Sequence, residues 1–224
     1  MTGRVLRIGH RGAAGHAPEN TVAAIEAGIS LGVDYVEIDV QRTADGRLVV
    51  MHDKRVDRTT SGTGLISEMS LDAIRALDAG NGQRVPLLAE VLAAVNGRTG
   101  LMAEIITPGL AGEMVAAVRQ SGFWSPLLYA SFLHRELLHV RVHDSGARTL
   151  ALLEGAPVSG PQFALDARAS HAGLALDSVT PEFVASLQQA GISVFVYTAN
   201  DPRDIARARK IGVDGIISDY PDRV

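Results

Sequence analysis

Cysteine is absent from all 224 residues of this chain, which excludes disulfide frameworks and thiolate metal sites. No apolar run approaches the roughly 20 residues that a membrane-spanning helix needs. The first ten residues are too short and too polar a stretch for a secretory signal peptide. We therefore expect no integral membrane segment, and a cytoplasmic location unless a longer N-terminal segment has been removed.

Positive charge is also scarce: 21 lysines and arginines face 25 acidic residues, and the formal net charge is −4. The basic residues are scattered along the chain, so charge supports neither a nucleic-acid partner nor an anionic membrane surface. The remaining composition, 46% hydrophobic and 21% charged, is that of an ordinary globular protein. The length fits one large domain or two small ones, and α/β barrels commonly occupy this range as a single domain.

Short apolar runs rich in β-branched residues alternate with amphipathic segments along almost the whole chain. The predicted strands are 5–9, 35–40, 101–105, 127–131, 149–153, 173–176, 193–198 and 215–218. The predicted helices are 21–31, 112–120, 135–142, 181–189 and 202–211. This alternation implies a parallel sheet, and eight such strands predict a closed (β/α)₈ TIM barrel. The alternative is a doubly wound open sheet, although no glycine-rich dinucleotide fingerprint follows the first strand.

One stretch, residues 41–85, interrupts this rhythm. It contains a hairpin turn signal at 44–46, a strand at 48–51 and a short helix at 71–77. We interpret it as a small insertion after the second strand that lies over one end of the barrel. Residues 1–224 are therefore expected to form a single TIM-barrel domain that carries this insertion.

Two carboxylates, Glu37 and Asp39, interrupt an otherwise apolar strand. Strand side chains alternate, so these two share a face, where they would repel each other and lose hydration. A divalent cation removes both problems, and oxygen ligands favour Mg²⁺ or Ca²⁺. The alternative is a structural pair held by arginine or backbone amides. Glu104, near the end of the next barrel strand, could complete a metal site, although a single glutamate at a strand end is more often structural.

Two histidines stand at predicted strand ends: His10 ends the first strand and His52 ends the extra strand. Histidine titrates near neutral pH, so this pair could supply a proton donor and a proton acceptor, unless both are structural. Asp53 is expected to orient a histidine or to hold its loop. Arg11 follows His10 and could bind a phosphate bidentately, or it could pair with Glu19 and brace the loop.

The same loop leads into the first predicted helix. Asn20 or Thr21 can cap that helix, and Glu19 is a weaker candidate for a position close to the metal.

Six segments of the chain resemble, in order, the motifs of the glycerophosphodiester phosphodiesterase family. They are the opening motif HRGAAGHAPENT at 10–21, and segments 37–39, 52–53, 57–64, 198–202 and 212–221. The resemblance spans nearly the whole chain and implies a barrel of this type.

The resemblance also implies an activity and roles for particular residues. Members hydrolyse glycerophosphodiesters to glycerol 3-phosphate and an alcohol, with Ca²⁺ or Mg²⁺ as the usual cofactor. The implied metal ligands are Glu37, Asp39 and Glu104. The implied acid/base pair is His10 and His52, with Arg11 on the phosphate. The expected partner is a small-molecule glycerophosphodiester; the alcohol group, the choice of ion and the oligomeric state stay open.

Two departures from the family pattern bear on catalysis. Ile106 stands where members usually carry a lysine that faces the phosphate, and Lys54 or Arg42 are the candidate replacements. Tyr197 stands where tryptophan is frequent, and it is expected to line the pocket for the alcohol and to contact substrate. Two alternatives therefore accompany the main hypothesis: a phosphodiesterase of the lysophospholipase D type, and a ligand-binding member whose catalysis is weakened by Ile106.

Overall fold

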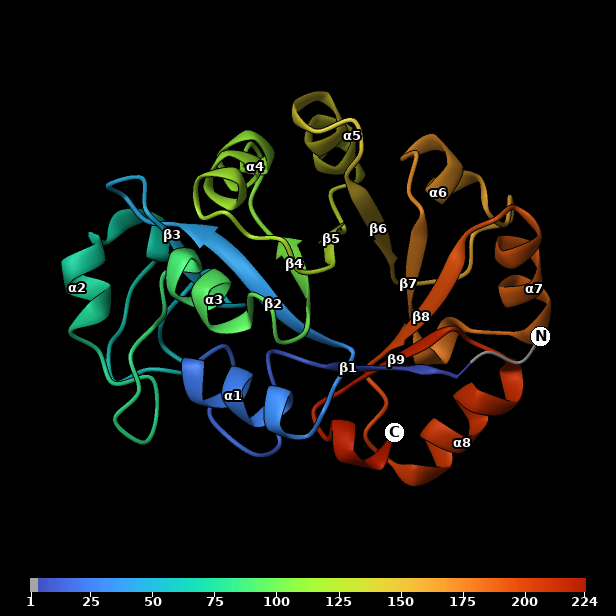
Figure 1. Ribbon diagram of the computed structural model, residues 1–224, viewed down its shortest axis with the longest axis horizontal. Helices are drawn as coiled ribbons and strands as arrows, with labels where there is room; N and C mark the ends of the chain where they lie inside the picture. The colour runs from blue at the N-terminus through green and yellow to red at the C-terminus, as the bar shows by residue number, and fades with distance from the viewer. Residues whose placement is uncertain (1–3) are drawn as a thin grey trace.

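Parallel pairing between β1 (Leu6–Gly9) and β2 (Tyr35–Arg42) closes the sheet into a barrel. The computed structural model describes residues 4–224, and its sheet runs in the order β1-β9-β8-β7-β6-β5-β4-β2-β3. All pairs in it are parallel except β2 with β3 (Figure 1). The other barrel strands are β4 (Gly100–Ile105), β5 (Leu127–Ser131), β6 (Arg148–Leu153), β7 (His171–Ala175), β8 (Ser193–Tyr197) and β9 (Gly215–Ser218). The TIM-barrel prediction is confirmed, and the open-sheet alternative is wrong.

Helices surround the barrel on its outer side (Figure 1). The five that the sequence predicts are α1 (Val22–Ser30), α4 (Ala111–Gln120), α5 (His134–His143), α7 (Pro181–Gln189) and α8 (Pro202–Ile211). The structure adds α3 (Leu88–Val95) and the short α6 (Gln162–Asp166). The buried residues of α3 have helical spacing, but no side chain before the helix caps it. Its N-terminus is instead capped from within the first turn by Glu90, whose side chain accepts from the Leu87 amide at 2.8 Å.

The centre of the barrel is filled with apolar side chains, so it is a core and not a channel. These side chains come from most of the strands and include Ile8, Met102, Leu128, Leu150, Phe195 and Ile217. Two further cores lie between the sheet and the surrounding helices. This packing confines polar chemistry to the ends of the barrel.

The insertion begins where β2 ends. Its strand β3 (Leu48–Val50) pairs antiparallel with β2 and is followed by the 3₁₀ turn η1 (Ile66–Glu68) and by α2 (Leu71–Arg75). The segment has a small apolar core of its own. His52 was predicted to end this strand, but it lies two residues beyond the last residue of β3. Gln41 fixes this loop, because its Nε2 donates to the backbone oxygens of residues 51, 52 and 53 at 2.9, 3.0 and 2.6 Å.

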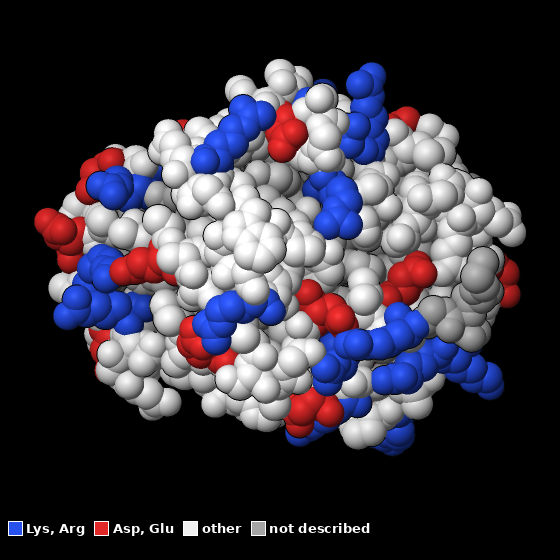
Figure 2. All heavy atoms as spheres, viewed as in Figure 1, with Lys and Arg blue, Asp and Glu red and all other residues white. Residues whose placement is uncertain are grey.

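Charged side chains of both signs are spread over the face seen in Figure 2. Within residues 4–224, no helix has the length and apolarity that crossing a membrane requires.

We expect Phe195→Ala to lower the free energy of unfolding by about 3–5 kcal/mol, because it leaves a cavity in the barrel interior. Phe195 is only 1% exposed, whereas Val142, on α5, is 78% exposed. Val142→Ala is the control and should stay within about 0.5 kcal/mol of the wild type. Denaturant unfolding measures both; equal effects would contradict the assignment of Phe195 to the core.

Candidate active site

Three carboxylates from two neighbouring strands, β2 and β4, lie close together. Glu37 and Asp39 lie on one face of β2, and the register of β2 with β4 puts Asp39 opposite Glu104. One oxygen from each of the three lies within 4.8 Å of the others. Glu37 and Asp39 are buried, with 5% and 1% exposure. The structure thus brings together the three residues for which the sequence suggests a metal role.

Burial and mutual repulsion disfavour the charged forms of these groups. Burial raises the pKa of Glu37 well above its usual value, and the charges on Asp39 and Glu104 raise it further. Burial and then the charge on Asp39 raise the pKa of Glu104 to about 8. The cluster therefore needs either protons or a cation to be stable at neutral pH. Its three oxygen donors fit a hard divalent ion such as Mg²⁺ or Ca²⁺.

Arg11 lies beside this cluster and is held from several sides. Its backbone amide donates to Glu37 at 2.7 Å, in a residue whose φ is +50°, and its Nη1 donates to Glu19 at 2.6 Å. Within residues 4–224, its buried Nε has no hydrogen-bond partner, and it lies 3.5 Å from an oxygen of Asp39. The pairing with Glu19 is confirmed. Glu19 itself is outside the carboxylate cluster.

Asn20 supports the cluster in a way that the sequence did not indicate. Its Nδ2 donates to Asp39 at 2.7 Å, and its Oδ1 accepts from the Asp39 amide at 3.2 Å. Thr21 is the residue that caps α1, since its Oγ1 accepts from the Ala24 amide at 3.3 Å. The sequence offers one signal for the contact between Asn20 and Asp39: two adjacent residues could cap α1. Only one of them is needed as the cap, so the side chain of the other is free to bind elsewhere.

His10 is oriented by a carboxylate from the other end of the chain. Its Nδ1 donates to Asp219 at 2.6 Å, which leaves Nε2 for chemistry. The side-chain amide of Asn200 donates to the other oxygen of Asp219 at 2.6 Å, and its Oδ1 accepts from the Asp219 backbone at 2.9 Å. Burial opposes ionisation of Asp219, but the hydrogen bond from His10 lowers its pKa. No pattern in the sequence indicated these roles of Asp219 and Asn200.

His52 is oriented in the same manner by its neighbour. Its Nδ1 donates to Asp53 at 2.7 Å, so the expectation that Asp53 contacts a histidine is confirmed. Hydrogen bonds from Arg58 are the main reason that the pKa of Asp53 lies below its usual value. Both histidines therefore use Nδ1 for a carboxylate and present Nε2.

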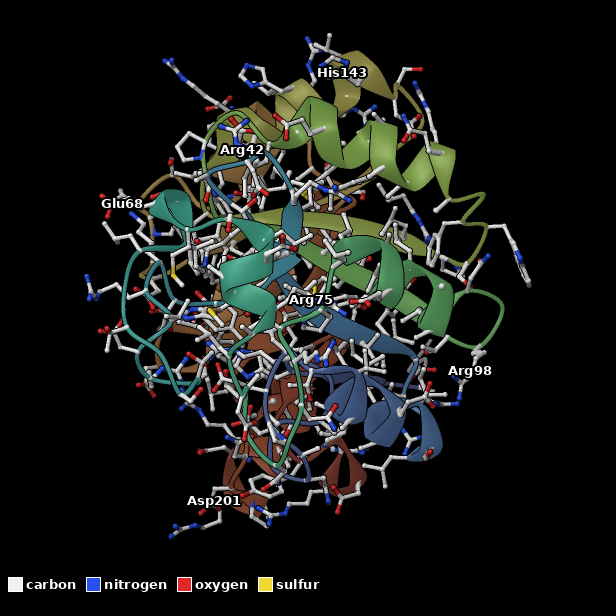
Figure 3. All side chains as sticks on the ribbon, turned by 90° about the vertical axis from the view of Figure 1, so that its left-hand side faces the viewer. Arg42, Glu68, Arg75, Arg98, His143 and Asp201 are labelled. Atoms are coloured by element: carbon white, nitrogen blue, oxygen red, sulfur yellow. The ribbon has the colours of Figure 1, made fainter. Side chains whose placement is uncertain are left out.

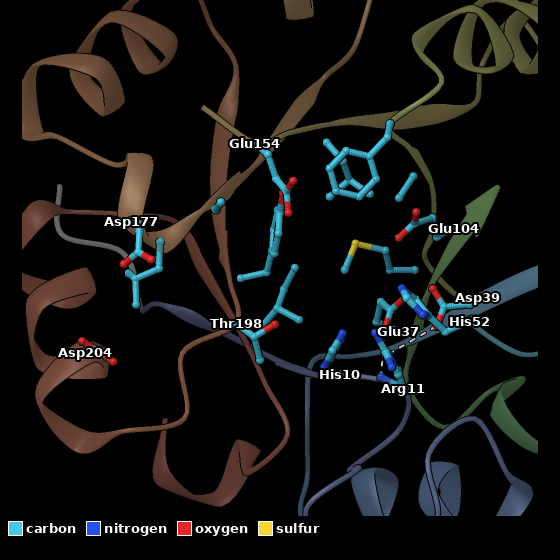
Figure 4. A pocket seen from close by; sticks show the side chains of 18 residues that line it. His10, Arg11, Glu37, Asp39, His52, Glu104, Glu154, Asp177, Thr198 and Asp204 are labelled. Carbon is cyan, nitrogen blue, oxygen red and sulfur yellow. Dashed lines mark hydrogen bonds and ion pairs between the residues drawn. The ribbon is translucent and has the colours of Figure 1, made fainter. Parts of the chain in front are cut away.

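The two histidines, Arg11 and the three carboxylates of the cluster line one cavity of about 540 Å³. In Figure 4, His10, Arg11, His52 and the three carboxylates gather on one side, and Glu154 and Asp177 lie on the other. The far wall includes Tyr197, whose hydroxyl donates to the Leu153 carbonyl at 3.1 Å. Its ring meets Phe132 edge to face, with 5.9 Å between ring centres. One side of the cavity thus holds the histidines, Arg11 and the carboxylate cluster, and the other is partly aromatic with further carboxylates.

The proposed replacements for the missing lysine do not reach this cavity. Arg42 instead donates to Glu113 of α4 at 2.5 Å, and in Figure 3 it lies beside that helix. Among the described residues, Arg11 is the only lysine or arginine that lines the cavity, and neither Lys54 nor Ile106 lines it.

Comparison with known proteins gives one consistent family. A model of the glycerophosphoryl diester phosphodiesterase family matches residues 10–223. The chain is 33% identical to a glycerophosphodiester phosphodiesterase of Caldanaerobacter subterraneus subsp. tengcongensis, over 98% of this chain and 96% of the relative. It is 29% identical to one of Bacillus subtilis, over 98% and 85%.

Solved structures agree with this assignment. An Oleispira antarctica phosphodiesterase, in complex with the product sn-glycerol-3-phosphate, superposes with a TM-score of 0.90 at 29% identity, covering 96% of this chain and 93% of that one. A protein of Silicibacter pomeroyi described as a glycerophosphoryl diester phosphodiesterase gives 0.90 at 31% identity, covering 98% and 91%.

The raised pKa values predict how pH changes the effect of a metal on stability. Between about pH 4.5 and 8 the folded metal-free protein keeps protons on the cluster that the unfolded chain has lost, so its stability falls as pH rises. A bound cation replaces those protons. We expect Ca²⁺ or Mg²⁺ to raise the melting temperature more at about pH 8 than at about pH 5.5.

Scanning calorimetry at both pH values measures this difference. Glu104→Gln removes one charge, so it should stabilise the metal-free protein at the higher pH and reduce the effect of the ion. An increment that is equal at both pH values, or larger at acid pH, would contradict the metal assignment.

Proposed function

Because the chain belongs to the glycerophosphoryl diester phosphodiesterase family, we propose that it hydrolyses glycerophosphodiesters to glycerol 3-phosphate and an alcohol with a divalent cation and two histidines. The family makes it a phosphoric diester hydrolase. The observation that carries the finer proposal is that three buried carboxylates and two aspartate-bound histidines line one cavity.

Glu37, Asp39 and Glu104 would hold the cation. When bound, it would offset their charges and polarise a phosphate oxygen of the substrate. The chain's own contribution is to keep the ligands in place through the Arg11 amide and the side chain of Asn20. Each of these contacts uses one carboxylate oxygen of Glu37 or Asp39 and leaves the other oxygen for the cation.

His10 and His52 exchange protons with the reacting oxygens through Nε2. One ring takes the proton of the attacking hydroxyl, and the other donates a proton to the leaving alcohol oxygen. When water attacks, this step gives glycerol 3-phosphate directly. When the glycerol hydroxyl attacks, it gives a cyclic phosphodiester, which a water then opens with the two rings in exchanged roles. The carboxylates on Nδ1 hold each ring and stabilise it when it is positively charged. Arg11 lines the cavity and binds a phosphate oxygen through its guanidinium.

The side of the cavity formed by Tyr197 and Phe132 receives the alcohol portion of the substrate. Because the hydroxyl of Tyr197 is bonded to the backbone, the ring is what it offers to the substrate. Phe132 and the next residue, Leu133, are 45% and 37% exposed, which leaves apolar surface beside the cavity. This surface is the observation that keeps a lysophospholipase D-like activity as the second candidate.

We expect His10→Ala and His52→Ala each to lower kcat by about 10²–10⁴-fold, because each removes one proton transfer. Release of glycerol 3-phosphate from glycerophosphocholine, with a lysophospholipid in parallel, measures this in the presence of Mg²⁺ or Ca²⁺. His143→Ala, at an exposed position of α5, is the control and should match the wild type. If both variants keep the wild-type rate, the histidines have another role.

Restoring a cation after β4 should increase the rate. Ile106 is half-buried, two residues after Glu104, and directly follows β4. A lysine there would stabilise charge that develops on the phosphate, and one such donor can contribute on the order of 10²-fold. We expect Ile106→Lys to raise kcat by about tenfold, with Ile106→Met as the uncharged control. Equal rates for the two variants would mean that Arg11 suffices.

A further inference from the structure

Arg58, in the insertion, binds two carboxylates at once. Its Nε and Nη2 donate to the two oxygens of Asp53 at 2.8 and 2.9 Å. Its Nη1 and Nη2 donate to the two oxygens of Glu19, both at 2.7 Å. The side chain is 48% exposed and does not line the catalytic cavity.

Each of these carboxylates has a second partner in the catalytic cavity. Asp53 accepts from Nδ1 of His52 at 2.7 Å, and Glu19 accepts from Nη1 of Arg11 at 2.6 Å. A continuous series of hydrogen bonds therefore runs from His52 through Asp53, Arg58 and Glu19 to Arg11. It links the histidine of the insertion to the arginine that follows the first barrel strand.

This link matters because His52 is not part of the barrel. It lies in a segment with its own apolar core, and its side chain is 43% exposed. Glu19, by contrast, is held by Arg11, whose amide is fixed to Glu37 of β2. A displacement of about 1 Å at a catalytic group can cost about 10²-fold in rate, so the position of the Asp53–His52 pair relative to the barrel has to be set.

The chemistry of arginine suits this role. A planar guanidinium can form paired hydrogen bonds with two carboxylates, whereas a lysine ammonium acts as a point charge with no fixed geometry. Ion pairs that are half-exposed contribute only about 0–1 kcal/mol to stability. The effect of Arg58 should therefore be seen in catalysis and not in unfolding.

We propose that Arg58 is a positioning residue: anchored to the barrel through Glu19, it holds Asp53 and so sets the orientation of His52 toward the cavity. The inference rests on the proposed function, because it assumes that His52 transfers a proton.

The test compares Arg58→Ala and Arg58→Lys with a matched control, Arg55→Ala. Arg55 lies in the same segment, is 54% exposed and pairs with Asp57. We expect Arg58→Ala to lower kcat for glycerophosphocholine by about 10–100-fold with a smaller change in KM. Arg58→Lys should recover only part of the loss, and Arg55→Ala should equal the wild type. All three should unfold at the wild-type temperature.

A second comparison shows whether Arg58 acts through His52. Once His52 is replaced by alanine, adding Arg58→Ala should cost little more, because nothing remains to be positioned. In a His10→Ala background it should keep its full effect. An additive loss in both backgrounds, a lowered unfolding temperature that accounts for the loss, or equal rates for Arg58→Ala and Arg55→Ala would overturn the proposal.

A readout that does not need turnover separates this proposal from the proposed function. Nitrogen NMR of the neutral His52 ring should show the Nδ1–H tautomer in the wild type and in Arg55→Ala, and a mixture of tautomers in Arg58→Ala. Identical signals in all three proteins would overturn the positioning role. Absence of turnover in the wild type, with the NMR difference present, would overturn the proposed function alone.

Discussion

Repulsion among Glu37, Asp39 and Glu104 is the constraint around which the cavity is organised. Carboxylates this close and this buried cannot all be ionised without compensation. Two residues with unfavourable positive φ, Arg11 at +50° and Asn20 at +57°, provide part of it. The first turns its amide to Glu37, and the second turns its side chain to Asp39. The remaining charge is what the proposed divalent cation would offset.

The barrel makes such a concentration of charge tolerable. Its interior is filled with apolar side chains, so the charged groups lie at one end of the barrel, on β2 and β4 and in the loops beside them. The catalytic groups and their supports come from five segments far apart in sequence: the loops after β1 and β9, strands β2 and β4, and the insertion that carries His52. The two histidines are equivalent in their contacts, yet one stands on the barrel and the other outside it. In our proposal, the hydrogen bonds of Arg58 to Asp53 and Glu19 hold the outer histidine in place relative to the barrel.

Local signals in the sequence were sufficient for the barrel strands, for five of the surrounding helices and for the first residues of the site. Alternating apolar segments predicted each barrel strand within two residues of its observed bounds, and i, i+2 spacing put Glu37 and Asp39 on one face. Helix α3 was missed because its capping group, Glu90, lies inside the helix and not before it. The contact of His10 with Asp219 joins residues 209 positions apart, and the one between Glu19 and Arg58 joins residues 39 apart. Such pairs depend on how the closed barrel and the insertion meet, which no local pattern encodes.

The central claim is that the carboxylate cluster works only with a divalent cation. Titrating chelator-treated protein with Ca²⁺ or Mg²⁺, while following both ion binding and glycerophosphocholine turnover, tests it most directly. We expect one ion to bind per chain and the rate to rise in proportion to occupancy. Full turnover by the metal-free protein, or ion binding with no change in rate, would contradict it.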